Sequence, residues 1–549
     1  MEADTRTEAA FPGTEVLEAE PALRNQARKS LLLAIVTLGS LAYLIGLLHY
    51  GHVRPIDADE GFYTTAARLV WESKTPYRDF FYQQAPLLPY LYSWIWAVHP
   101  RSLVGMRTFS AACGGLAVFL WGFGLFSLKR LPTKIATATF AAVLLNPYWV
   151  QWNVVVKTFA VSNLLASIAM LSLYAALHSK RVRWYFAAGL ALGVCASVRS
   201  LHGPLIPAVL LWILWREWRT AGPPYLKTLT FLGGSVCGLL PMIFSFVRDP
   251  HAFIFNNITY HGLDAGYLWV GGGKIVTGYQ SAEHVFSIYM VFILYRILAV
   301  HPYFIAELVV AGSGIASWLK LRTKREEPYT NEDYSYFQLA FLTLTVYTVT
   351  ALIPFPPYDQ YFDSPMVPFL VPFVAEGLRL AFRRGIAWVA VLAVVAPILF
   401  WTEIPRLSPN GIFGRPRSYG AWELAPYRKI AETIEANSHP NDVVLSFWPG
   451  YVFESGRQYF PGLEDHLVYR IMSRISPEER ARYHVAGKDQ IMTALSARAA
   501  GVIVMAPAEW MAEYDYNLSP EEIKSFQASL ESGYSRVSEI DDVKIYRRR

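Results

Sequence analysis

The sequence predicts a multi-pass α-helical membrane protein with about 11 transmembrane helices and a small C-terminal α/β domain on the outer side of the membrane. Three observations predict this class. Hydrophobic residues make up 53% of the 549 residues and charged residues only 17%, whereas soluble domains carry about 25% charged residues. Apolar stretches of about 16–22 residues, close to the length that crosses a bilayer, recur along most of the chain. The remainder is charged and alternates between helix and strand patterns.

Each predicted span is a run of mostly apolar residues that suits the hydrocarbon core of a bilayer. The apolar stretch 283–300 is interpreted as an interfacial helix, because another span there would break the charge pattern described next. The predicted spans together form a transmembrane domain over residues 30–402. They cover residues 31–50, 104–126, 135–150, 158–177, 184–199, 203–215, 228–247, 301–319, 335–354, 364–382 and 386–402.

Basic residues between the spans predict which side of the membrane each loop occupies. Six clusters of Lys and Arg all fall on the same side of the predicted spans, and such clusters are retained in the cytoplasm. The N-terminus is therefore expected in the cytoplasm and the C-terminus outside. Residues 1–29 are expected to be a disordered cytoplasmic tail, because their first part is acidic and polar. The net charge of +6 reflects the loop clusters, so no nucleic-acid partner is expected.

The C-terminal part is expected to be a separate domain. Residues 403–425 are rich in Pro and Gly and are interpreted as a linker, and residues 426–549 as the extracytoplasmic α/β domain. The segment Ser519–Glu522 has the pattern of a capping box that opens a helix. The expected helices are 424–437, 488–499 and 520–532, and the expected strands are Val443–Phe447, Val502–Met505 and a hairpin around Asp541 and Asp542.

A cluster of carboxylates follows the first predicted span. Asp57, Asp59 and Glu60 lie in an outer loop, residues 51–103, with two expected amphipathic helices, Gly61–Ser73 and Pro86–Val98. Carboxylates beside a bilayer are costly without partners and indicate function. A carboxylate that is partly shielded from water can act as a general base near neutral pH. It would deprotonate an acceptor hydroxyl, which then attacks an activated sugar carbon.

Two other interpretations of this cluster stay open. The acids can be a solvated loop, or can pair with Arg54, Arg68 or Arg78. Alternatively, Asp57 and Asp59 can hold a divalent cation, Mg²⁺ or Mn²⁺, because hard cations take carboxylate oxygens. No cofactor is required by the sequence otherwise.

The acidic cluster also opens a longer motif. The segment reads DEGFYTTAARLVWESKTPYRDFFYQQAPLLPYLYS from Asp59 onward. It resembles the first outer loop of membrane glycosyltransferases of the GT-C fold, closest to the bacterial protein mannosyltransferase and aminoarabinose (lipid A) transferase group, which is glycosyltransferase family 39/83-like. Asp59 and Glu60 match the Asp-Glu pair of that group, Tyr63 matches a tyrosine four residues after the Asp, and the segment 85–87 matches its Pro-Pro-Leu.

The resemblance implies an enzyme of the plasma (bacterial inner) membrane. It implies a polyprenyl-phosphate sugar as the donor and a lipid, glycan or protein as the acceptor on the extracytoplasmic face. By the same resemblance Asp59 is the catalytic base, and Glu60 orients it or helps to bind the acceptor. An inverting single displacement is expected, since one base is present without an obvious nucleophile.

One departure from the family pattern concerns the donor phosphate. Relatives often place Glu-Lys or His before the Pro-Pro segment, where this chain has Gln83 and Gln84. Arg78, Arg199 or Lys274 can substitute for that lysine, because cationic side chains suit phosphate. Arg199 can instead be an arginine that snorkels to the interface. The expected donor- or acceptor-binding residues are Asp57, Tyr63, Arg78, Gln84, Arg199, Lys274, Asp359 and Tyr361.

Two rival functions belong to other classes. A transporter or flippase of lipid-linked sugars would also need charges that face a cavity, but it predicts inverted repeats, and the sequence has no such symmetry. A non-catalytic cell-envelope assembly factor would use the outer α/β domain to bind partners.

Overall fold

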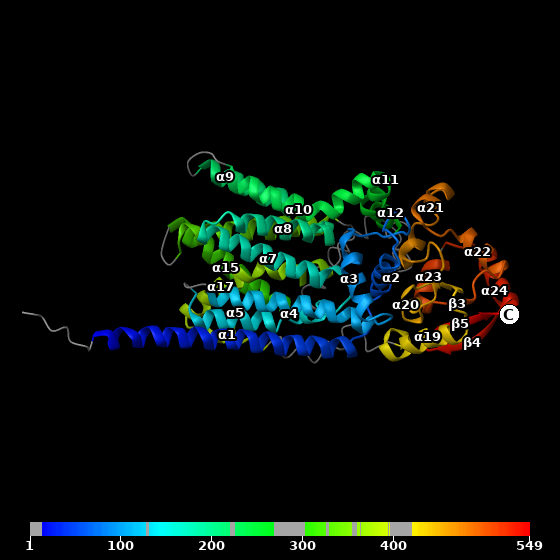
Figure 1. The fold of residues 1–549 in the computed structure, drawn as a ribbon, viewed down its shortest axis with the longest axis horizontal. Helices are drawn as coiled ribbons and strands as arrows, with labels where there is room; N and C mark the ends of the chain where they lie inside the picture. Colours follow the sequence, from blue (N-terminus) through cyan, green and yellow to red (C-terminus); the bar gives the residue numbers. More distant parts are fainter. Residues whose placement is uncertain are drawn as a thin grey trace, which may run out of the picture.

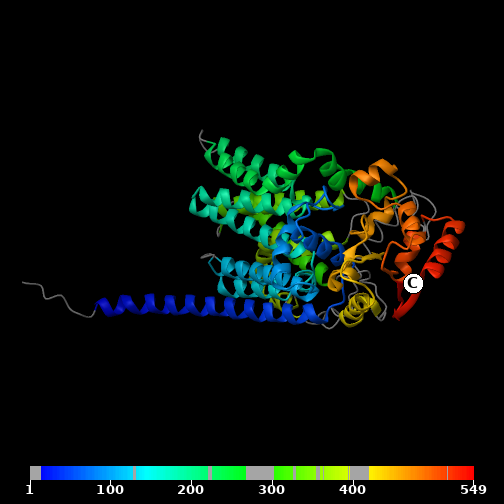
Figure 2. The same cartoon turned by 45° about the vertical axis from the view of Figure 1, so that its right-hand side comes forward.

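A computed structural model describes residues 14–127, 131–219, 225–267, 302–324, 329–353, 359–362, 364–392, 395, 420–515 and 517–549. A bundle of helices forms one end of the elongated molecule and a domain with a β-sheet forms the other, with the long helix α1 along one side of the bundle (Figure 1). Figure 2 shows the same division from a second direction. The fold therefore has the two parts that the sequence predicts.

Six of the described helices are long and apolar enough to cross a membrane. Most predicted spans coincide with one helix each, which confirms the prediction that these apolar stretches are helical. The six spans are Ser30–Val53 within α1 (Thr14–Val53), α4 (Leu103–Ser127), α7 (Thr158–Ser179), α10 (Leu226–Arg248), α16 (Asn331–Leu352) and Ser364–Arg383, which includes α17 (Val367–Arg383). The other bundle helices are α5 (Thr133–Leu144), α8 (Arg183–Val198), α9 (Leu205–Arg219) and α15 (Pro302–Lys324).

Small residues bring neighbouring helices of the bundle into close contact. A Cβ atom on Gly189 of α8 would lie 2.1 Å from the backbone oxygen of Phe231, and one on Gly234 of α10 would lie 2.2 Å from that of Phe186. Backbones this close leave no room for a side chain, and they gain the tight packing that holds helices together in lipid.

The predicted span 135–150 is wrong as a single helix. The chain forms α5, then turns, and continues as the short helix α6 (Pro147–Trp152). The Asn146 side chain accepts hydrogen bonds from the backbone of Tyr148 and Trp149, and Pro147 takes the first helical position. Both features start a new helix instead of continuing the old one. Residues 153–157, which follow α6, reach the acidic cluster, where Lys157 contacts Asp57 and Asp59.

One other prediction differs from the structure, and three fall wholly or mostly outside the described residues. Helix α1 starts at Thr14, so it extends into the tail that the sequence predicts to be disordered; a span that is already helical propagates into residues of good helix propensity at little cost. The stretch 283–300, Lys274 and most of the span 386–402 lie outside the described residues.

The loop between α1 and α4 contains both helices that the sequence predicts. They are α2 (Glu60–Trp71) and α3 (Leu87–Val98). A second group of short elements follows α10 at the same end of the bundle (Figure 1). These are α11 (Pro250–Ile254), the π-helical turn η2 (Phe255–Thr259) and α12 (Tyr260–Tyr267). The 3₁₀ turn η1 (Ser200–His202) follows α8. A second 3₁₀ turn, η5 (Asp359–Tyr361), precedes a third, η6 (Ser364–Met366).

The C-terminal domain contains a five-stranded sheet in the order β2-β1-β3-β5-β4. Strands β1, β2 and β3 are parallel, and β4 and β5 form the predicted antiparallel hairpin. The predicted helices and strands are all present, and the sequence analysis missed β2, η8, α20, η9, α21 and α23. The strands are β1 (Val443–Ser446), β2 (Gln458–Tyr459), β3 (Val502–Val504), β4 (Tyr534–Ile540) and β5 (Val543–Arg548). The helices are η8 (Gly420–Trp422), α19 (Leu424–Ala436), α20 (Gly450–Ser455), η9 (His466–Arg470), α21 (Pro477–Tyr483), α22 (Lys488–Ser496), α23 (Ala508–Asp515) and α24 (Pro520–Gly533).

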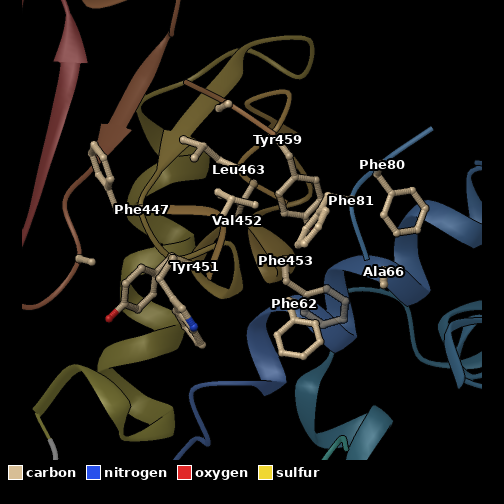
Figure 3. Close-up of a cluster of buried hydrophobic side chains, with 14 of the residues drawn as sticks. Phe62, Ala66, Phe80, Phe81, Phe447, Tyr451, Val452, Phe453, Tyr459 and Leu463 are labelled. Carbon is tan, nitrogen blue, oxygen red and sulfur yellow. The ribbon is translucent and has the colours of Figure 1, made fainter. Parts of the chain in front are cut away.

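One hydrophobic core joins the C-terminal domain to the outer loop. Phe62 and Ala66 of α2 lie beside Phe453 of α20 and Tyr459 of β2, and all four side chains are buried (Figure 3). Burial of large aromatic side chains contributes about 1.5–3 kcal/mol each. The α/β domain is therefore packed directly on the helix that follows the acidic cluster.

Candidate active site

The acidic residues form a compact turn between α1 and α2, residues 57–60, called the acid loop below. The Asp57 side chain accepts a hydrogen bond from the backbone N–H of Asp59 at 3.0 Å. The backbone N–H of Asp57 donates to Glu60 Oε2 at 2.9 Å. These bonds within the turn fix the directions of the Asp57 and Glu60 carboxylates relative to the backbone of the turn.

Glu60 holds the acid loop to the bundle. Its carboxylate receives Arg107 Nη2 at 2.6 Å and Nε at 2.9 Å, and both side chains are buried. The backbone N–H of Val156 donates to the same carboxylate at 3.0 Å. Burial would raise the pKa of Glu60, but Arg107 lowers it below its ordinary value. Glu60 therefore connects α2, α4 and the segment 153–157, and it does not line the cavity described below.

Lys157 lies between the other two acids. Its Nζ is 2.7 Å from Asp59 Oδ2 and 3.1 Å from Asp57 Oδ1, and its side chain is only 6% exposed. It also donates to Gln360 Oε1 of η5 at 3.2 Å. The sequence analysis missed Lys157. The signal was a single lysine in the apolar run VVVKTF at the outer end of a predicted span, a position where an ionisable residue is costly.

The charges of Lys157, Asp57 and Asp59 shift the pKa values of the two aspartates. Burial raises the pKa of Asp57, Lys157 opposes this effect and the neighbouring Asp59 adds to it, so the pKa of Asp57 is raised. Burial acts on Asp59 in the same direction, but Lys157 and then His466 outweigh it, so the pKa of Asp59 is lowered. Asp59, whose carboxylate lies 2.7 Å from Lys157 Nζ, is thus the closer ion-pair partner of Lys157.

A cavity of about 410 Å³ opens next to Asp59. Arg199, at the end of α8, is 5% exposed, and its guanidinium carbon lies 4.4 Å from the ring centre of Phe159 and 4.5 Å from that of Tyr361. Its Nη1 donates to Thr158 at 2.9 Å, while its buried Nε has no hydrogen-bond partner among the described residues. A guanidinium fixed between two rings with a free donor is suited to an anionic oxygen. The lining includes Asp59, Tyr63, Gln84, Lys157, Arg199, Asn257, His261 and Tyr361.

The structure gathers most of the predicted site residues and separates a few. Arg78 is not among the lining residues; its side chain is 60% exposed and lies 3.6 Å from Asp79. Asp359 starts η5, and the next two residues of that turn line the cavity. The side chain of Asp359 is not among those that the structure describes. Lys274 lies outside the described residues altogether. The cavity residues Asp59, Tyr63, Gln84, Arg199 and Tyr361 lie together as the sequence predicts.

The predicted cation site on Asp57 and Asp59 does not fit this arrangement. The Lys157 ammonium already contacts both carboxylates, where a divalent ion would have to bind. Across the described ranges, no group of three or more His, Cys, Asp or Glu side chains is placed to hold a metal ion. The positive charge beside the acids is thus supplied by the chain itself.

Comparisons with known proteins find a matching family model and similar solved folds. The family model of dolichyl-phosphate-mannose-protein mannosyltransferases matches residues 83–245. The structure of ArnT from Cupriavidus metallidurans bound to undecaprenyl phosphate superposes with a TM-score of 0.59 at 15% identity, over 93% of this chain and 98% of that one. The chain has the GT-C fold. The same protein in its apo state superposes with a TM-score of 0.57 at 15% identity, over 93% and 97% of the two chains. No curated protein sequence matches this chain.

The GT-C fold confirms the resemblance that the sequence predicts and shows a multi-pass membrane protein. The family match spans α3 to α10 and so includes Lys157 and Arg199, whereas the acid loop precedes it. The two cations of the cavity therefore lie in the part of the GT-C chain that resembles mannosyltransferases.

Proposed function

We propose that this GT-C protein is a glycosyltransferase that moves a sugar from a polyprenyl-phosphate donor to an acceptor on the extracytoplasmic face of the plasma membrane. One observation carries the proposal. An ionised carboxylate, Asp59, and two buried cations, Lys157 and Arg199, line a single cavity. A base for the acceptor and partners for a leaving phosphate are the two requirements of such a transfer.

The donor phosphate would bind between Lys157 and Arg199. ArnT, which shares the fold, was solved with undecaprenyl phosphate, and cationic side chains form strong hydrogen bonds to phosphate. As the bond from the sugar to phosphate oxygen breaks, negative charge grows on that oxygen. Cations already in place would stabilise this charge without reorganisation.

Asp59 would remove the proton from the acceptor. In the described structure the Lys157 ammonium keeps its pKa low, which makes the carboxylate a weak base. A donor phosphate would share the Lys157 charge and so raise the basicity of Asp59 when the substrate is bound. Because the attack needs no enzyme nucleophile, a single displacement with inversion is expected. Asp57 and Glu60 would orient the base.

The membrane arrangement is part of the same proposal. The predicted 11 or so spans, with six basic clusters on one side, would put the N-terminus in the cytoplasm. The acid loop, the cavity and the α/β domain would then lie outside the cytoplasm, where lipid-linked donors are used without nucleotides.

The test is transfer by purified protein in detergent or nanodiscs. Mannose or aminoarabinose on polyprenyl phosphate serves as donor, and release of polyprenyl phosphate is measured. Asp59→Asn keeps the shape of the side chain and removes the base, so we expect transfer to fall by about 10²–10⁴-fold. Asp79→Asn is the matched control, since Asp79 lies in the same outer loop but not in the cavity.

The outcome also separates the rival functions. Wild-type transfer by Asp59→Asn would refute the role of the base. A flippase would move donor across vesicles without releasing polyprenyl phosphate, and an assembly factor would do neither.

A further inference from the structure

The acid loop is held from its outer side by the α/β domain. Trp448 lies in the turn between β1 and α20, and its indole N–H donates to the backbone oxygen of Ala58 at 2.8 Å. Ala58 stands between the two acids that contact Lys157. The contact joins residues separated by 390 positions, and it is buried, with Trp448 only 1% exposed.

The indole also lies directly against Gly61. A Cβ atom at Gly61 would lie 2.7 Å from Trp448 Nε1 and Cε2, closer than any carbon contact allows. Glycine is thus needed at the start of α2 for the ring to reach the acid loop. A second link is the hydrogen bond from the backbone N–H of Ile56 to the oxygen of Trp422 at 2.7 Å.

The position of Trp448 is itself determined by its neighbours. The ring centre lies 4.8 Å from Trp422, 4.6 Å from Tyr451 and 6.1 Å from Tyr427, each in edge-to-face geometry. Its backbone N–H donates to Ser446 Oγ at 3.3 Å, at the end of β1. A donor with such fixed surroundings can position the group that it contacts, because its own rotamer is locked.

On the membrane side the acid loop is held by Glu60 and Arg107, and on the outer side by Trp448. We infer that Trp448 is a positioning residue for the acid loop, and that the α/β domain is in this way an integral part of the active site. The catalytic part of this inference rests on the proposed function. Without the indole bond, the segment 57–61 loses its outer support, and Asp59 is free to move away from Lys157 and from the acceptor.

The test compares two conservative variants of the same aromatic cluster. Trp448→Phe keeps an aromatic ring and removes the N–H, whereas Tyr451→Phe changes a neighbouring ring whose hydroxyl has no partner among the described residues. Hydrogen–deuterium exchange of peptides covering residues 57–61 is the first readout. We expect faster exchange there in Trp448→Phe, and exchange like the parent protein in Tyr451→Phe.

Turnover is the second readout. A small misplacement of a catalytic group costs up to about 10²-fold, so we expect kcat to fall about ten- to hundredfold in Trp448→Phe. Stabilisation by added undecaprenyl phosphate should be unchanged, since Arg199 is untouched. If Trp448→Phe folds poorly, Gly61→Ala disturbs the same contact from the loop side and should accelerate the same exchange.

Equal exchange and equal kcat in Trp448→Phe and Tyr451→Phe would overturn the inference. If the parent protein transfers no sugar, the proposed function fails. The exchange measurement still decides then whether Trp448 positions the acid loop.

Discussion

Replacement of Lys157 by methionine is the most informative perturbation of the site. Methionine has a similar length, so the main change is the loss of a buried ammonium that lies 2.7 Å from the carboxylate of Asp59 and 3.1 Å from that of Asp57. Removal of one partner of a buried ion pair costs about 3–5 kcal/mol, because the other charge is left without compensation. We expect Lys157→Met to lose stability of that order at and above neutral pH.

The pH dependence of the loss follows from Asp59. Its pKa is lowered in the folded protein, so the ion pair stabilises the fold above the ordinary carboxyl pKa, and this contribution disappears as pH falls through the lowered pKa. The variant lacks the contribution at every pH. The difference in melting temperature between wild type and Lys157→Met should therefore be largest at pH 7–8, roughly, and should shrink towards acid pH.

The pH dependence of the transfer rate should also change, because it depends on the pKa of Asp59. An opposite charge at this distance lowers a carboxyl pKa by about 1–3 units. In Lys157→Met the acidic limb of the pH–rate profile should move to higher pH by a shift of about that size.

Thermal unfolding in detergent between acid and slightly alkaline pH provides the stability measurement. Arg78→Met is the matched control. It removes a cation from an exposed pair with Asp79, and such pairs contribute about 0–1 kcal/mol. A melting temperature and pH–rate profile of Lys157→Met that match those of Arg78→Met would refute the reasoning.

Three further predictions concern other parts of the site. Arg199→Met should weaken binding of undecaprenyl phosphate by about 10–100-fold, because charge-assisted hydrogen bonds contribute about 1.5–3 kcal/mol. Titration measures this affinity, and an unchanged value would exclude Arg199 as a phosphate ligand. Arg107→Met should destabilise the protein by about 3–5 kcal/mol, and adding Glu60→Gln should restore part of the loss in thermal unfolding; failure of any rescue would contradict the role of this pair. Asp465, which accepts a hydrogen bond from Gln83 at 3.1 Å, has its pKa raised by burial to about 7. Because the pKa is raised on folding, the protonated acid stabilises the fold below the ordinary carboxyl pKa, and this contribution declines as pH rises until it is lost above about 7. The melting temperature of Asp465→Asn relative to wild type should therefore increase progressively from acid pH to about 7 and stay higher above it.

Several features could be predicted from the sequence because they depend on local pattern. The apolar runs, the helices α2 and α3, and the hairpin of β4 and β5 follow from periodicity and turn residues within one segment. Asp59, Tyr63 and Gln84 were found for a similar reason, since they lie in one continuous motif. Arg199 was proposed as a phosphate ligand because a cationic side chain can substitute for the lysine of the resembling family.

The residues that complete the site were not predicted, because their contacts join separate elements. Lys157 is visible in the sequence as a single lysine in an apolar run, but its contact with Asp59 depends on how the segment 153–157 packs against the acid loop. Trp448 is 390 positions from its partner and lies in a different domain, where no local pattern marks it.

The sequence by itself determined the class of the protein, a helical membrane domain followed by a small α/β domain, together with the acidic cluster that follows the first span. Hydrophobic length and residue period act within a single element, so they are visible in one dimension. Only the tertiary structure decided which cation neutralises Asp59, how Glu60 is anchored and how the α/β domain reaches the acid loop. Those contacts depend on how separate elements pack, and packing brings together residues whose spacing in the chain carries no information about their distance in space.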